Sequence, residues 1–362
     1  MSVIDKMDLS DTVRAQFKAY ERKLKLMNFA ERNIENTFWR MLPFVRHQNV
    51  TDMAQVTSEQ IEDWYLWRRE NCSEYTSHGD YRTLRLYYQR MHPEKNIFTF
   101  KPKPPKATLP VDQVLTEEEI RALRDACETV RDRALIMFLW DTGCRITEAL
   151  SLNLNQVIID QYGGVVIVNG KTGRRRLRLT ACIPDLQNWL NQHPLKAAQD
   201  APLWVTYNRV GTAGPRRLSV RTVQGRLKYL ERKLGLKKSI HPHGIRHARS
   251  TNQAKRGFTE TEMRILNGWS PGSRMPQVYI HLSGADVEKK VLRLAGIVQD
   301  ESNKPGPLDP VECPRCHHRN EPGALYCTKC AFIVDEKTAQ TLVLMHQKVI
   351  EDPEVIRLSY KK

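Results

Sequence analysis

Four cysteines near the C-terminal end of the chain are spaced as metal ligands. They form two Cys-x-x-Cys pairs, and ten residues separate the two pairs. Four thiolates around one ion make the closed tetrahedral site by which proteins hold structural zinc. A segment of about 20 residues cannot bury a core of its own, so metal binding would supply its folding energy. We therefore predict a zinc ribbon over residues 312–334, in which structural Zn²⁺ is held by Cys313, Cys316, Cys327 and Cys330.

Two other kinds of site would fit the same cysteine spacing: an iron–sulfur cluster and a pair of disulfides. The N-terminal stretch MSVIDKMDLSDTVRAQF is charged throughout and lacks the apolar region of a secretory signal. We therefore expect a cytoplasmic protein in a reducing compartment, which favours zinc over disulfides. His317 and His318 follow the first pair and are expected to be exposed, because four thiols already complete the ligand set. The ribbon could contact DNA or a neighbouring subunit.

Four stretches between residues 109 and 298 carry other side chains that could do chemistry. They are TGCRITEAL, NGKTGRR, HPHGIRHARST and GWSPGSRMPQVYIHLS. Each stretch alone has an ordinary structural explanation. Arg145 could pair with Glu148 along one helix face, Lys171 suits a hairpin turn, and Tyr279 is one of 12 tyrosines. No single stretch therefore indicates a catalytic site.

Taken together and in order, the four stretches resemble the tyrosine recombinase and integrase family. That family has an arginine in a T-G-x-R-x-x-E-x-L helix start, a lysine in a β-hairpin turn, and a His-x-x-Arg motif. A Gly-His or Gly-Trp pair and a tyrosine about ten residues later complete the set. The resemblance covers about residues 10–298, and the cysteine cluster behind it looks most like the archaeal, Xer-like or integrase branch. The matching residues here are Arg145, Lys171, His243, Arg246, Trp269 and Tyr279.

The resemblance implies how the anionic part of the site would work. The non-bridging oxygens of a phosphodiester gain negative charge in an in-line displacement, and a guanidinium offers a planar fork of donors that fits them. Arg145 and Arg246 would clamp these oxygens. Trp269 stands where most integrases have histidine, and its indole N–H can only donate. Trp269 could therefore hold a phosphate oxygen but could not exchange the reacting proton.

The resemblance also implies the covalent step. Tyr279 would attack the phosphate, Lys171 would protonate the leaving 5′ oxygen, and His243 is the acid–base candidate. A phenol with a pKa near 10 is a poor nucleophile at neutral pH, so Tyr279 needs a cationic site or a nearby base. The product would be a 3′-phosphotyrosine that keeps the bond energy for rejoining. This chemistry calls for no metal, no ATP, no nucleotide cofactor and no small-molecule substrate.

The elements that must position these residues form a mainly α fold with a small antiparallel β-sheet. Helical spacing dominates the N-terminal part, capping boxes are expected at Thr57 and Thr116, and ALIMFLW predicts a central buried helix. Three β-rich runs separated by QYGG and NGKTG predict the sheet. The expected segments are a helical core-binding domain (8–100), a linker (101–108), the catalytic domain (109–298), a second linker (299–311), the ribbon (312–334) and a C-terminal helix and tail (335–362).

The charge of the chain points to double-stranded DNA as the partner, and we therefore expect the cytoplasmic protein to be associated with the nucleoid. The net charge is +16, and the longest apolar run is far too short for a membrane span. Residues 161–180 hold five basic residues and no acid, and residues 207–238 hold ten basic residues and one acid. Runs this one-sided favour phosphate contact over a solvated mixed face. By resemblance, we also expect a homotetramer on DNA, with the predicted helix ADVEKKVLRLAG packed on a neighbouring subunit or on its own domain.

Three functions are compatible with these residues. The leading one is a site-specific recombinase or integrase. A nicking-closing enzyme of the type IB topoisomerase kind, acting as a monomer, would use the same chemistry. A DNA-binding regulator on a recombinase scaffold would need no catalysis, but the complete set of catalytic residue types argues against it.

Overall fold

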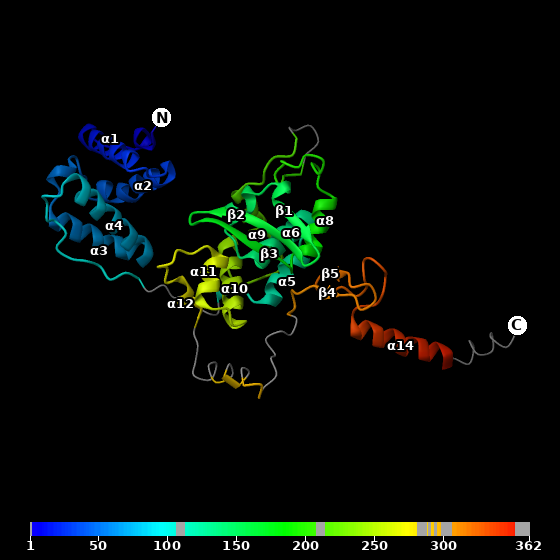
Figure 1. Cartoon of the computed structure of the whole chain (residues 1–362). Helices are drawn as coiled ribbons and strands as arrows, with labels where there is room; N and C mark the ends of the chain where they lie inside the picture. Colours follow the sequence, from blue (N-terminus) through cyan, green and yellow to red (C-terminus); the bar gives the residue numbers. More distant parts are fainter. Residues whose placement is uncertain are drawn as a thin grey trace. The chain divides into compact units, whose positions relative to one another are not determined.

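The structure of the protein is a computed structural model that describes residues 2–105, 113–207, 214–280 and 306–351, with a few residues between 288 and 297. Side chains of the last helix are described as far as Met345. The chain divides into two compact units, residues 1–107 and 108–362 (Figure 1). Each unit has its own hydrophobic core. The fold is mainly helical with small antiparallel sheets, as the sequence predicted.

The N-terminal unit is a helical bundle around an aromatic core. Phe17 packs on Phe38 with ring centroids 5.1 Å apart, and Tyr20 meets Tyr87 edge to face at 5.0 Å. The capping box expected at Thr57 is confirmed, with Gln60 as its partner. The elements of this unit are η1 (Val3–Lys6), α1 (Asp11–Leu26), α2 (Glu31–His47), η2 (Met53–Gln55), α3 (Ser58–Asn71) and α4 (Glu74–Met91).

The chain leaves this unit through an anchored segment. Tyr81 donates a hydrogen bond to the backbone oxygen of Phe100, and the two rings lie 4.9 Å apart. Residues up to Phe100 thus pack on the bundle, directly before the basic KPKPPK stretch. The expected linker 101–108 lies within the described residues only as far as position 105.

The second unit surrounds one buried helix with a sheet and further helices. As predicted, the ALIMFLW helix is central, and Ala134 through Trp140 are at most 3% exposed. Its elements up to residue 280 are α5 (Glu117–Asp125), α6 (Val130–Thr142), α7 (Ile146–Ser151), η4 (Leu154–Gln156), β1 (Val157–Asp160), β2 (Gly163–Gly170), β3 (Gly173–Leu179), α8 (Ile183–Asn191), α9 (Val220–Lys233), α10 (Pro242–Lys255), α11 (Glu260–Asn267) and α12 (Met275–Tyr279).

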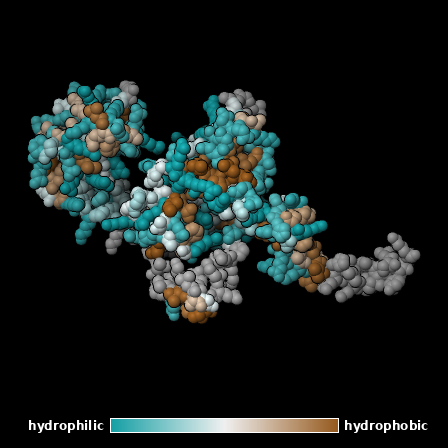
Figure 2. All heavy atoms as spheres, in the orientation of Figure 1, coloured by the Kyte–Doolittle hydropathy of each residue, from teal (hydrophilic) through white to brown (hydrophobic). Residues whose placement is uncertain are grey.

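The three-stranded sheet is antiparallel in the order β1-β2-β3. Alternate side chains point to opposite faces, and the register pairs Val166 with Leu177, both buried against the helices. Asp141 at the end of α6 accepts hydrogen bonds from the backbone N–H groups of Thr180 at 2.7 Å and Cys182 at 3.1 Å. This carboxylate fixes β3 and α8 to α6. Ile158 and Ile167 on the outer face are 60% and 49% exposed. Figure 2 shows a brown, hydrophobic patch over the strands of this unit.

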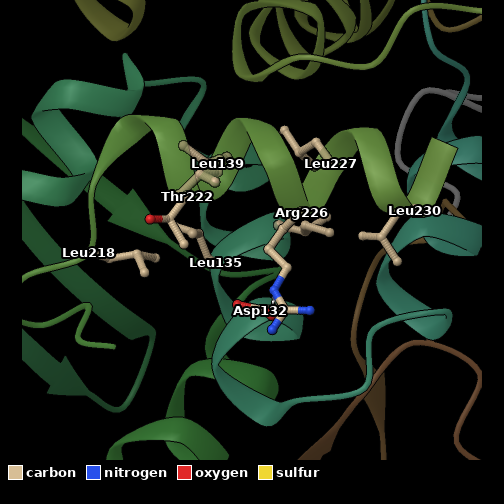
Figure 3. A pocket seen from close by; sticks show the side chains of 10 residues that line it. Asp132, Leu135, Leu139, Leu218, Thr222, Arg226, Leu227 and Leu230 are labelled. Atoms are coloured by element: carbon tan, nitrogen blue, oxygen red, sulfur yellow. Dashed lines mark ion pairs between the residues drawn. The ribbon is translucent and has the colours of Figure 1, made fainter. Parts of the chain in front are cut away.

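Helix α9 packs along α6 with an apolar pocket between them. Leu227 and Leu230 of α9 face Leu135 of α6, and an ion pair of 3.8 Å between Asp132 and Arg226 borders the pocket (Figure 3). None of the six catalytic candidates lines this pocket. We therefore interpret this pocket as a gap in the packing of the two helices, separate from the candidate reactive site.

Beyond residue 280 most of the helix predicted over 285–296 lies outside the described residues. The chain is described again from Gly306, and Leu308 is buried in the core of the second unit at 1% exposure. Asp309 pairs with Arg256 of α10 at 3.1 Å. The described part of the expected linker 299–311 therefore lies against the catalytic unit. Next come β4 (Val311–Glu312), β5 (Arg319–Asn320) and the predicted C-terminal helix, α14 (Glu336–Glu351).

Among the helices that the structure describes, none is both long enough and apolar enough to span a bilayer.

Candidate active site and metal centre

The first arginine of the candidate site stands at the start of α7. Gly143 ends α6 in the left-handed region (φ 58°), which turns the chain so that Arg145 caps α7. The Arg145 guanidinium donates to Glu148 Oε1 at 2.9 Å and to the backbone oxygen of Gly268 at 3.2 Å. The pairing with Glu148 expected from the sequence is confirmed. Arg145 also reaches the loop that carries the Gly-Trp pair.

The second arginine converges on the same loop from α10. Arg246 is 3% exposed and donates to the backbone oxygens of Gly143 at 2.9 Å and Asn267 at 2.6 Å. Burial, followed by the charge of Arg145, lowers the pKa of Arg246 to about 10, so it stays charged at neutral pH. Two guanidinium groups distant in sequence are thus held beside one short segment, Asn267-Gly268.

Tyr279 lies in the same cluster. Its ring is 8% exposed and stacks on Trp269 at 5.6 Å with an interplanar angle of 5°, and the Arg246 guanidinium lies 5.8 Å from the Trp269 ring centre. The hydroxyl of Tyr279 forms a hydrogen bond with Nδ1 of His247. The structure therefore brings the proposed nucleophile together with Arg246 and Trp269 inside one chain.

Burial sets the protonation of this pair. It raises the pKa of Tyr279 to about 12, and it lowers the pKa of His247 to about 4, helped by the neighbouring side chains of His243, His241 and Arg246. At neutral pH the phenol is protonated and the imidazole is neutral. A neutral imidazole beside a phenol can accept its proton.

The histidine at the tyrosine is therefore His247 rather than His243. The His243 ring packs edge-on against the His247 ring at 4.3 Å, and the residue keeps part of its surface open to solvent. Partial burial and the charge of Arg246 lower the pKa of His243. His247 directly follows Arg246 in the sequence and was not among the predicted site residues. Its position one helical turn after His243 was the signal that both rings share a face.

Lys171 occupies the turn between β2 and β3, as predicted, and is exposed. The next residue, Thr172, donates its hydroxyl to the backbone oxygen of Gly268 at 3.2 Å. The lysine hairpin therefore touches the same loop as Arg145. Five of the six candidates therefore lie around Gly268, if Lys171 is included because its neighbour Thr172 contacts this loop. The sixth, His243, contacts the cluster through the ring of His247.

One carboxylate sits among these cations. Glu148 is 3% exposed; burial by itself would raise its pKa, but hydrogen bonds from Arg175 and Arg145 lower the pKa below its ordinary value. Glu148 is therefore ionised. With Arg145, Arg175 and Arg246 around one carboxylate, the site keeps excess positive charge and can bind an anion beside the phenol of Tyr279.

The four C-terminal cysteines meet as predicted for a metal ion. Their sulfur atoms all lie within 4.8 Å of one another, and the pairs Cys313–Cys330 and Cys316–Cys327 are each 3.6 Å apart. A tetrahedron with bonds of ~2.3 Å requires sulfur separations of ~3.8 Å, whereas a disulfide requires ~2.05 Å. The cluster can therefore hold a metal ion, and its spacing does not fit disulfides.

The backbone around the cysteines shows two equivalent knuckles. The residue after the second cysteine of each pair has a positive φ, 56° at His317 and 57° at Ala331. Each donates its N–H to the backbone oxygen of the first cysteine in its pair, at 2.9 and 2.8 Å. The His317 ring bonds Glu312 at 2.9 Å, away from the sulfur cluster. Among the described residues, the group that could hold an ion here consists of the four cysteines.

The ribbon is anchored to the catalytic unit by an ionic cluster. Arg124 of α5 is 3% exposed and donates to Asp185 at 2.8 and 3.1 Å, and Glu321 of the ribbon completes its shell. Arg319 adds a hydrogen bond of 3.3 Å to the backbone oxygen of Tyr162 in the β1–β2 turn. A folded ribbon is needed to place Glu321 over Arg124.

Residues 113–285 match the model of the Phage integrase family. The tyrosine recombinase XerD of Vibrio vulnificus is 30% identical over 217 residues, which cover 55% of this chain and 67% of XerD. The tyrosine recombinase XerA of Pyrococcus furiosus is 30% identical over 199 residues, covering 53% of this chain and 64% of XerA. This chain thus matches less than two thirds of the length of XerA.

A solved structure shares the fold. The Tn1549 transposon integrase, in complex with transposon right-end DNA, matches with a TM-score of 0.60 and 18% sequence identity. The match covers 77% of this chain and 99% of that chain.

Proposed function

We infer that this chain, which belongs to the phage integrase family of tyrosine recombinases, cleaves and rejoins DNA strands through a covalent phosphotyrosine at Tyr279. The observation that carries the proposal is the hydrogen bond between Tyr279 and the neutral His247, beside two arginines held at one loop. The relatives named above are recombinases by name. We propose that this chain uses that chemistry as a site-specific recombinase or integrase.

The proposed step exchanges one phosphoester for another. Arg145, Arg246 and the Trp269 N–H bind the non-bridging oxygens of the scissile phosphate. The oxygen of Tyr279 forms a bond to phosphorus while the bond to the 5′ oxygen breaks. The phenol proton passes to His247, and Lys171 gives a proton to the departing 5′ oxygen, which leaves as a hydroxyl. Because one phosphodiester replaces another, the step needs no ATP, and the reverse attack rejoins the strand.

We further propose that Tyr279 acts within its own subunit. Its hydroxyl is already bonded to His247 of the same chain, and its ring lies flat on Trp269. A tyrosine that served a neighbouring subunit would have to leave both contacts.

Double-stranded DNA is the proposed partner and a homotetramer the proposed assembly. Recombination of two duplexes breaks four strands, and each chain supplies one tyrosine, so four chains are needed. The exposed arginines of β3, Arg174 and Arg176, belong to the one-sided basic run expected to contact phosphates. The helix expected to link subunits lies mostly outside the described residues.

The metal of the ribbon is proposed to be zinc. Four thiolates at tetrahedral separations are a closed structural site, with no open position for a substrate. The site stands apart from Tyr279 in the sequence and supplies none of the groups in the proposed cleavage step. The ion would stabilise the fold of the ribbon.

The proposed function is tested by trapping covalent protein–DNA adducts and sequencing the attached DNA. Adducts at one recurring sequence, with strand exchange between two copies of that sequence, are the expected result. Supercoil relaxation without exchange would favour the nicking-closing enzyme, and the absence of any adduct would favour a non-catalytic regulator.

Cleavage by the wild type is expected to be insensitive to pH near neutrality and to slow as the pH falls toward about 4, where His247 takes up a proton. A His247→Ala variant has no side chain that accepts the phenol proton, so Tyr279 must lose this proton to the solvent before it attacks. Because the pKa of Tyr279 is about 12, its rate should rise about tenfold per pH unit from neutral pH upward. Single-turnover cleavage rates across pH measure both profiles. If His243→Ala acquires this slope and His247→Ala does not, His243 is the base.

Removal of the metal is expected to unfold the ribbon and destabilise the catalytic unit. Arg124 would lose Glu321 but keep Asp185, a loss of about 1 kcal/mol, which lowers Tm by roughly 2–4 °C. Metal analysis and thermal unfolding of Cys327→Ser test this, with Cys72→Ser as the control outside the cluster. A Cys327→Ser variant that keeps its full zinc content would refute the site. Visible absorbance typical of an iron–sulfur cluster in the wild type would show that the cysteines hold such a cluster instead of zinc.

A further inference from the structure

Arg175 is a buried arginine in a strand whose other arginines face outward. Strand side chains alternate, and Arg174 and Arg176 on either side of Arg175 are exposed. The Arg175 side chain is only 8% exposed. The sequence placed it in the basic run expected to contact phosphates, and this expectation is wrong for Arg175. A buried guanidinium persists only where partners satisfy its charge and its donors.

The partners of Arg175 use all three of its nitrogen atoms. Nη1 and Nη2 donate to Glu148 Oε1 at 3.2 Å and Oε2 at 2.6 Å, a two-pronged pair. Nε donates to the backbone oxygen of Leu266 at 3.0 Å. One side chain therefore joins β3 to α7 and to the end of α11.

Each of the two residues that Arg175 contacts, Glu148 and Leu266, either supports a site arginine or adjoins the residue that does. The carboxylate of Glu148 also accepts from Nη1 and from the backbone N–H of Arg145, each at 2.9 Å. Leu266 directly precedes Asn267, whose backbone oxygen holds Arg246 at 2.6 Å. Arg175 thus contacts the support of each phosphate-clamping arginine without being placed to touch the phosphate itself.

Two glycines make room for this network. A Cβ at Gly268 would lie 2.6 Å from Nη1 of Arg175, and Gly268 also has a φ of +59° that side chains rarely adopt. A Cβ at Gly170 would overlap the carboxylate of Glu148. Backbone on both sides of the Arg175–Glu148 pair therefore approaches as closely as glycine alone allows.

We propose that Arg175 is a positioning residue that keeps Arg145 available to the scissile phosphate and fixes the loop that holds Arg246; this rests on the proposed cleavage function. Without Arg175, Arg145 would be the remaining cation hydrogen-bonded to the buried carboxylate of Glu148. Glu148 would then draw the Arg145 guanidinium into a two-pronged pair and cancel its charge. The phosphate would lose one of its two clamps although Arg145 itself is intact.

The test compares Arg175→Met with Arg131→Met at saturating protein, on a nicked duplex carrying the sequence recovered from wild-type adducts. Arg131 is a matched control, because it is 3% exposed, pairs with Asp132 at 2.6 Å and donates to the backbone oxygen of Val205 at 2.9 Å. Both variants should lose stability. Only Arg175→Met should lose cleavage rate per folded molecule, by about 10²-fold, with DNA affinity unchanged.

A second substitution separates positioning from packing. In the Arg175→Met background, Glu148→Gln removes the charge that captures Arg145, so the double variant should cleave faster than Arg175→Met alone. Arg175→Lys keeps the charge but not the fork, and should fold normally with an intermediate loss. A wild-type rate in Arg175→Lys, or no recovery in the double variant, overturns the proposal. If the wild type forms no adduct in the same assay, the proposed function fails instead.

Discussion

A Tyr279→Phe variant is expected to bind DNA as the wild type does and to form no covalent adduct with it. The substitution removes one oxygen and keeps the ring, so the stacking on Trp269 at 5.6 Å can persist. The hydroxyl group that attacks phosphorus is lost, and the phenylalanine ring carries no nucleophile in its place. A nicked suicide substrate, on which the cut cannot be rejoined, measures this as a protein–DNA band under denaturing conditions.

The fold of Tyr279→Phe should be nearly intact. His247 loses a hydrogen-bond partner in a half-buried position, which costs about 1 kcal/mol and lowers Tm by roughly 2–4 °C. Tyr229→Phe is the control. Tyr229 lies on α9, away from the site, where its hydroxyl donates a hydrogen bond to Glu128 at 2.7 Å and its ring is 39% exposed. Adduct recovered from Tyr279→Phe would identify another nucleophile and refute the assignment.

The sequence predicted the elements of the site better than the contacts between its residues. A glycine after Thr142, a hairpin turn at Lys171 and the helix bearing Arg246 follow from local patterns, since caps and turns depend on neighbouring residues. The four cysteine ligands follow from spacing too, because each knuckle is a local turn. These predictions did not need the tertiary fold.

What the sequence could not predict was which side chain meets which across the fold. His243 and His247 lie on one helix face, and only the approach of α12 decides that Tyr279 bonds His247. Arg175 looked like one of five exposed phosphate contacts. Its place on the inward face depends on strand register, and its partner Glu148 lies 27 residues away.

The same limit applies to the segment before the ribbon. Its composition, QDESNKPGPLDPV, is typical of a linker, yet Leu308 is buried in the catalytic core at 1% exposure. Apolar residues this sparse in a polar, proline-rich segment give no periodic signal. Its burial, with the contact of Glu321 on Arg124, makes the ribbon part of the second unit.

An Arg246→Ala variant is expected to lower the cleavage rate by about 10²–10³-fold, the typical cost of losing a donor aimed at developing charge. The charge of Arg246 opposes the effect of burial on the pKa of Tyr279, so its loss should also make the phenol harder to ionise. Arg246→Lys should lie between the wild type and Arg246→Ala, because lysine keeps the charge but lacks the fork. Single-turnover rates on a saturated DNA substrate measure the loss.

Stability must be separated from chemistry in this comparison, since Arg246 also binds two buried carbonyl groups. Leaving the oxygens of Gly143 and Asn267 without a donor costs about 1–3 kcal/mol. Arg256→Ala, at the end of the same helix, breaks the pair with Asp309 and controls for destabilisation of α10. Rates per folded molecule should fall only in Arg246→Ala. An equal fall in Arg256→Ala would mean that Arg246 supports the helix, and that the charge stabilising the phosphate must come from elsewhere in the site.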